Sequence, residues 1–305
     1  SARHYAVAKT STDIGMECWI QSGAHGSQDG SHDQVLSPSG GVSIQAAPAV
    51  EPENHDRRSH GLPRISEAAT PSPAEYQTLF RKALQEPNSL TPDDIEVLVA
   101  SICQSAICKV NYAMPGAEFC VTVMERCERT QHDLGEMFLE NVLLFCCELF
   151  NSRDHILRPP DQPTNGARHW GSYVIFLAEL LDGLNEAENT AGPSRSGGAH
   201  AAKARCMMVL ATLICASCRT MLQPPSSYMP SEMDCLRTAL ITAGAALEHE
   251  APEQLAALMR DVQAALETQR LPIHSQHVLQ KLLEPKASGW QMNESEKAYG
   301  SPTSR

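Results

Sequence analysis

Cys215 and Cys218 have the spacing in this sequence that comes nearest to a chemical site. A Cys-x-x-Cys pair can act as a redox dithiol or supply half of the ligands of a structural zinc ion. A structural zinc site needs a second ligand pair, and the helical stretch around these two cysteines is apolar, with Met207 and Leu213 close by. The pattern therefore favours two thiols packed in a core over a metal site.

His274 and His277 form a second pair, near the start of a predicted helix. Two imidazoles on one face of a helix can share a metal ion. No carboxylate or cysteine motif stands beside them in the sequence to complete a ligand set. Two solvated histidines are the simpler interpretation, and neither a metal nor another cofactor is predicted.

The sequence also lacks the motifs that mark common enzyme sites. There is no Gly-x-Ser-x-Gly elbow, no phosphate loop ending in Gly-Lys-Ser/Thr, no His-Glu-x-x-His and no dinucleotide glycine fingerprint. Each of these would place a reactive atom at the end of a helix or strand. We therefore predict that the protein is not an enzyme.

The net charge of the chain argues against a protein whose main role is to bind nucleic acid. The 24 Lys and Arg against 36 Asp and Glu give a formal charge of −12, which disfavours contact with a phosphate backbone. Lys203, Arg205, Arg219 and Arg237 are scattered, without the clustering and interleaved aromatic residues of a nucleic-acid platform. We expect these four side chains on solvated helix faces.

Ten of the eleven cysteines fall inside apolar helical stretches, which is typical of reduced thiols in a protein core. They are Cys103, Cys108, Cys120, Cys127, Cys146, Cys147, Cys206, Cys215, Cys218 and Cys235. Residues 1–10 lack the apolar segment that a signal peptide would have. The sequence does not begin with Met, so we expect that it is a fragment of a longer protein. These features predict a cytoplasmic protein, with perinuclear and nuclear locations left open.

The longest apolar run, residues 207–218, is about half of the ~20 residues that a spanning helix requires. No membrane span is therefore predicted. Residues 1–72 contain recurring Gly, Ser, Pro and His without helical or strand periodicity, so we predict a disordered N-terminal tail. That tail is either a plain tether or a carrier of short partner motifs.

From Pro73 onward the pattern predicts an all-α domain. Ser72 and Thr91 can each cap a helix, and a proline follows each of them at the first helical position. Further helices are predicted near residues 117–128, 132–150, 167–184, 201–222, 231–247, 253–268 and 275–283. Residues 185–200, which include Gly-Pro-Ser-Arg-Ser-Gly-Gly, are predicted to form a flexible surface loop.

Single helices of this kind cannot bury their apolar faces alone, and short connections make sequential neighbours antiparallel. The simplest arrangement is a row of helix pairs, each about 40 residues long, as in HEAT-type repeats. We therefore predict a HEAT-like stack of antiparallel helix pairs, an α-α superhelix.

Three segments of the chain resemble one family. Residues 168–181 begin with Arg168-His169-Trp170 and end in Phe-x-x-Glu-Leu, as does the central helix of the middle domain of eukaryotic initiation factor 4G. Residues 231–248 are similar to its Glu-x-Asp/Glu-Cys-Leu … Gly-x-x-Leu-Glu helix. The ending Ala-Ser-Gly-Trp290, followed by Tyr299, is similar to that of the small branch, whose members work with the cap-binding complex or the histone stem-loop-binding protein.

The resemblance covers residues 73–299 and implies a helical-repeat domain of the initiation factor 4G middle type. It implies a non-catalytic scaffold in messenger-RNA translation initiation, with a 4A-type helicase, cap-binding proteins or an mRNA-specific adaptor as partners. Direct binding to messenger RNA and an adaptor role outside translation stay open as alternatives. A homodimer stays open too, because small helical-repeat domains can dimerise through an exposed face.

Partner-binding residues are expected at both ends of the matched region. Arg168 and Trp170 open the matched helix, and exposed Arg and Trp side chains are common interface anchors. Packing of Trp170 between helical pairs is the alternative. Trp290 poses the same choice, because it can cap the last pair or receive a partner motif. The sequence departs from the family where Gly300 follows Tyr299 in place of a second tyrosine.

Overall fold

The computed structural model describes residues 73–108, 110–130, 132–157, 163–191, 197–268, 270–287 and 290. The predicted tail over residues 1–72 and the last residues of the predicted domain, 291–299, lie outside the described residues. The fold of the described part is all-α, and no strand occurs in it. Its elements are α2 (Pro73–Gln85), η1 (Pro87–Ser89), α3 (Pro92–Cys108), α4 (Val110–Thr130), α5 (His132–Asn151), α6 (Arg153–Ile156), α7 (Pro163–Ala191), α8 (Gly197–Met221), η2 (Ser226–Tyr228), α9 (Pro230–Glu250), α10 (Pro252–Thr268) and α11 (Ile273–Ala287).

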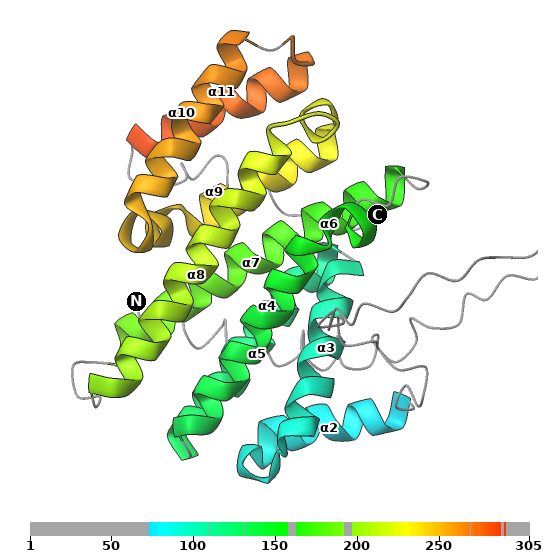
Figure 1. The fold of residues 1–305 in the computed structure, drawn as a ribbon, viewed down its shortest axis with the longest axis vertical. Helices are drawn as coiled ribbons and strands as arrows, with labels where there is room; N and C mark the ends of the chain where they lie inside the picture. Colours follow the sequence, from blue (N-terminus) through cyan, green and yellow to red (C-terminus); the bar gives the residue numbers. More distant parts are fainter. Residues whose placement is uncertain are drawn as a thin grey trace, which may run out of the picture.

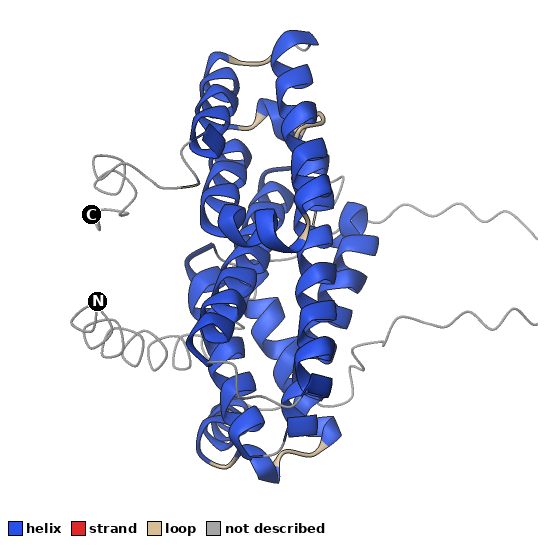
Figure 2. Cartoon of the chain, turned by 90° about the vertical axis from the view of Figure 1, so that its left-hand side faces the viewer, coloured by secondary structure: helices blue, strands red, loops and turns tan. Residues whose placement is uncertain are grey.

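The long helices form two layers, which Figure 2 shows edge-on as two columns. In layer A, α3 contacts α5, α5 contacts α8, and α8 contacts α10. In layer B, α4 contacts α7, α7 contacts α9, and α9 contacts α11. The chain alternates between the layers, and the sequential neighbours α3–α4, α8–α9 and α10–α11 each form a contacting helix pair (Figure 1). This is the helical-repeat-like architecture that the sequence predicts.

The start of α3 shows how the sequence fixes a helix end. Thr91 Oγ1 accepts a hydrogen bond from the Asp94 N–H at 3.1 Å, and Asp94 Oδ2 accepts one from the Thr91 N–H at 3.0 Å. This reciprocal pair is a capping box, and it confirms the predicted cap at Thr91. Lys82 Nζ lies 2.7 Å from the same Oδ2 and joins α2 to α3. The hydrogen bond from Lys82, followed by that from Thr91, lowers the pKa of Asp94.

Several predicted boundaries are wrong. Helix α4 begins at Val110, not near residue 117, and runs through Pro115. A proline removes one helical hydrogen bond, and the buried Ala113 and Ala117 on either side show that packing outweighs this loss. The predicted loop 185–200 is also wrong over residues 185–191 and 197–200, because α7 continues to Ala191 and α8 begins at Gly197, while residues 192–196 lie outside the described residues. Residues 185–191 contain helix-forming Glu and Ala and no Gly or Pro, so nothing ends the helix there.

Helix α8 bears on two further expectations. Its residues Ala202–Met221 are long and apolar enough, by length and composition, to cross a membrane, which a count of the uninterrupted apolar run did not reveal. Of that window, 56% is buried inside the protein, as in a core helix. Lys203, which we expected on a solvated face, is buried, because position 203 shares one helical stripe with Met207 and Leu210. Arg205 is exposed as expected, and Arg219 Nε lies 2.9 Å from Asp261 Oδ2 on α10.

The cysteines mostly occupy the core, as predicted, and none of the ten in the described residues forms a disulfide. Those that are buried are Cys103, Cys120, Cys127, Cys146, Cys206, Cys215 and Cys218, while Cys147 and Cys235 are half-buried. Cys108 is exposed, so the prediction is wrong there. It is the last residue of α3.

Candidate functional site

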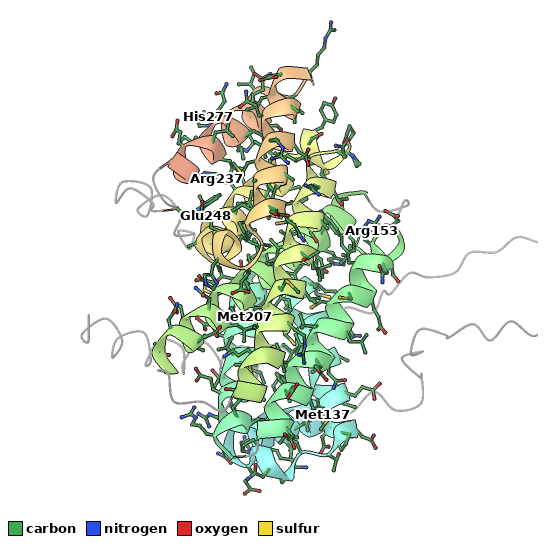
Figure 3. All side chains as sticks on the ribbon, turned by 60° about the vertical axis from the view of Figure 1, so that its left-hand side comes forward. Met137, Arg153, Met207, Arg237, Glu248 and His277 are labelled. Atoms are coloured by element: carbon green, nitrogen blue, oxygen red, sulfur yellow. The ribbon has the colours of Figure 1, made fainter. Side chains whose placement is uncertain are left out.

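Trp170 lies in α7 and is fully buried. Its ring stacks between Tyr173, with ring centroids 5.7 Å apart, and Phe150 of α5, 6.2 Å away. The Tyr173 hydroxyl donates a hydrogen bond to the Cys146 carbonyl at 2.8 Å. The guanidinium of Arg153, labelled in Figure 3, lies 4.7 Å from the Phe150 ring centroid. Trp170 therefore packs between helical pairs, and the alternative of an exposed anchor is wrong.

Arg168 lies two residues before Trp170 in α7. Its side chain is outside the described residues, so its predicted contact with a partner stays a prediction. Trp290 follows α11 and packs on Gly244 of α9, with 7% of its surface exposed. Trp290 is therefore packed against α9, and its predicted contact with a partner stays a prediction. The structure does not bring Trp170 and Trp290 together, because they contact different helices.

The two predicted pairs with metal-ligand spacing differ in their surroundings. Burial raises the pKa of Cys215 to about 11 and that of Cys218 well above its usual value, as expected for thiols in a core. His274 and His277 are exposed, as predicted. A carboxylate does stand beside one of them, because His274 Nε2 lies 2.9 Å from Asp234 Oδ1 on α9. Among the residues that the structure describes, no group of three or more side chains could hold a metal ion.

Four carboxylates from two layer B helices interact where α4 and α7 pack together, and we call them the carboxylate cluster. They are Glu118 of α4 and Glu179, Asp182 and Glu186 of α7. Burial, reinforced by the charges of Asp182 and Glu118, raises the pKa of Glu179 to about 7, while a hydrogen bond from Thr242 of α9 opposes that rise. Burial and Glu186 raise the pKa of Asp182 to about 6. Near neutral pH the cluster is therefore only partly ionised, and it carries less negative charge than four free carboxylates would.

Sequence reasoning missed this cluster, although part of its signal was present. Positions 179, 182 and 186 repeat at the spacing of one helix face. Glu118 could not be added from the sequence, because its place depends on how α4 packs against α7. Chemically, such a group attracts cationic side chains. It repels phosphates for the same reason.

A second surface feature is apolar and lies on layer A. Leu144 of α5 and Met208 of α8 are 59% and 51% exposed, and Val97 of α3 and Val209 of α8 are also exposed. Large apolar side chains on adjacent helices are common at protein contacts. Neither this surface nor the carboxylate cluster contains a nucleophile paired with a base.

Comparison with known proteins adds no relative: the chain matches no protein-family model, and no curated protein is significantly similar to it.

Proposed function

We propose that this protein is a non-catalytic scaffold in messenger-RNA translation initiation, which binds a 4A-type helicase, cap-binding proteins or an mRNA-specific adaptor. The observation that carries this proposal is the placement of the three segments that resemble the initiation factor 4G middle domain. Residues 168–181 form the middle of α7, residues 231–248 form most of α9, and Trp290 packs on α9. Segments far apart in sequence thus lie in one continuous part of layer B, as a resemblance to one domain requires.

Contacts join these three segments directly. A Cβ on Gly171 of α7 would lie 2.7 Å from Cys235 Sγ of α9, so the two helices approach closely there. Further along the same helices, Thr242 donates a hydrogen bond to Glu179. Stacked helix pairs of this kind present long outer faces that suit peptides and domains.

The charges of layer B favour protein partners over direct contact with RNA. The carboxylate cluster would repel a phosphate backbone, while it suits the Lys and Arg of a basic protein segment. We infer that partners with basic surfaces bind across α4 and α7, and that messenger RNA is reached through them.

The test is a pull-down with the full chain from a cell lysate, with and without nuclease, followed by mass spectrometry. Capture of a 4A-type helicase, cap-binding proteins or an mRNA adaptor after nuclease treatment supports the proposal. Loss of these proteins with RNA favours direct RNA binding, and capture of none of them contradicts a role in translation.

Matched variants locate the contact. Glu118→Gln with Glu186→Gln removes two charges from the exposed part of the carboxylate cluster without changing side-chain size. Glu96→Gln with Glu140→Gln removes two exposed charges from layer A. Capture should fall at least several-fold with the first pair and stay unchanged with the second. Equal losses would show that net charge alone matters.

A further inference from the structure

Trp290 lies directly against the backbone of α9. A Cβ built on Gly244 would lie 2.2 Å from Cδ2 and 2.3 Å from Cε3 of the Trp290 ring, far inside van der Waals contact. The ring therefore occupies a notch that glycine alone leaves open. Only 7% of Trp290 is exposed, so the notch and its surroundings enclose most of the side chain.

Two features of Trp290 make its packed conformation less favourable in free energy. Its φ of 61° lies in the left-handed region, which a bulky residue rarely adopts. Its indole N–H is buried without a hydrogen-bond acceptor among the described residues, whereas buried indole N–H groups usually have one. Both costs offset the gain from burying the ring. The docked and released positions of Trp290 are therefore closer in free energy than for an ordinary core tryptophan.

Release of Trp290 also requires little else to change. The residue lies beyond α11, which ends at Ala287, so it can leave Gly244 while every described helix stays formed. What it leaves behind is a site for a flat ring on the surface of layer B. A residue from another chain could place its ring there with an ordinary extended backbone and avoid the left-handed strain.

We propose that the notch over Gly244 is a binding site for an aromatic side chain presented by an extended peptide segment. In the absence of such a peptide, Trp290 of the same chain occupies the site and can be displaced from it; we call Trp290 the strap. The ligand class follows from the ring that the notch already holds. The site is separate from the carboxylate cluster, and the inference does not depend on a role in translation.

The first experiment tests the strap in the full chain with Gly244→Ala, which puts a methyl group where the ring lies. We expect Trp290 to be expelled, so that tryptophan emission shifts to longer wavelength and acrylamide quenches about one of the 3 tryptophans more strongly. Ala245→Ser, at the exposed neighbouring position of α9, is the control and should change neither signal. Unchanged emission and quenching in Gly244→Ala would overturn the strap.

The second experiment tests the binding site, with indole as the probe. Indole should raise the melting temperature of Trp290→Ala by several degrees in a saturable way and leave the wild-type protein nearly unchanged. The double variant Gly244→Ala/Trp290→Ala should show no such rise, because the methyl group fills the notch. If Trp290→Ala lacks the helical circular dichroism of the wild type, Trp290→Leu takes its place. No saturable rise in the folded single variant, or an equal rise in the double variant, would overturn the proposal.

Discussion

Helix α9 is approached closely from two sides, by α7 and by Trp290, and the two contacts are built differently. Toward α7, Cys235 lies against Gly171, and the neighbouring Trp170 of α7 is fully buried. Toward the strap, Gly244 receives a single ring from a residue outside any helix. The two α9 positions are nine residues apart and so face opposite sides of the helix. The first contact is therefore part of a continuous core, whereas the second depends on one side chain.

The difference should be greatest when each tryptophan is removed, and Trp170→Ala is the larger of the two changes. It removes a ring that stacks on Phe150 and Tyr173 with no exposed surface. Replacing a large buried aromatic residue by alanine costs about 3–5 kcal/mol. For a domain of this size the melting temperature should fall by about 6–20 °C. Thermal unfolding followed by circular dichroism measures the effect, and Trp170→Phe should recover part of the loss.

The burial of Trp170 marks the limit of what the sequence could establish. Apolar periodicity placed α5 and α10 within one residue of their observed bounds, because each has a clear stripe and a proline or polar start. The depth of a side chain depends on the neighbouring helix, and the ring that stacks on Trp170 belongs to Phe150, twenty residues earlier in the chain. The carboxylate cluster and the Gly244 notch likewise depend on helix register between elements, which a single sequence does not encode locally.

Gly171→Ala tests whether the α7–α9 contact is as tight as its geometry indicates. The added Cβ would lie 2.7 Å from Cys235 Sγ, so the two helices must shift apart or the thiol must move. Overpacking of this kind costs about 1–3 kcal/mol, less the preference of a helix for alanine over glycine. We expect a net cost of at most about 2 kcal/mol and a melting temperature lower by up to about 8 °C.

The close contact between residue 171 and Cys235 can also be relieved by a substitution on α9. Cys235→Ala removes the Sγ atom, so Gly171→Ala in that background should cost much less than in the wild type. A double-mutant cycle measures this coupling. Additive effects of the two substitutions would mean that α7 and α9 do not press on each other at this point.

Trp290→Ala should have a smaller effect than either change, although the residue type is the same as Trp170. Loss of the buried ring destabilises the protein, but the variant also relieves the left-handed strain and the buried N–H. We expect the melting temperature to fall by at least ~2 °C, and by about 2–4 °C for each kcal/mol lost. A loss as large as that of Trp170→Ala would show that the strap is part of the core, and the contrast between the two contacts would fail.

Glu179→Gln gives the smallest effect and the one with a distinctive pH dependence. Burial and the neighbouring carboxylates raise the pKa of Glu179 from 4.5 to about 7 in the folded protein. Between these values the folded state binds more protons than the unfolded chain, so the stability of the protein falls as the pH rises toward 7. Above that range the charged form carries the full penalty, which the neutral glutamine does not.

The expected result is therefore a variant that melts at the same temperature as the wild type near pH 4.5 and about 1–3 °C higher at pH 8, equivalent to about 1 kcal/mol or less. The gain stays small because the carboxylate is only partly buried and water screens much of its charge. Glu96→Gln, on the exposed face of α3, removes the same charge outside the α7–α9 contact and should show no pH-dependent difference. A gain at pH 8 that persists undiminished at pH 4.5 would mean that glutamine simply packs better against Thr242. The carboxylate cluster would then be a solvated helix face and not a strained part of layer B.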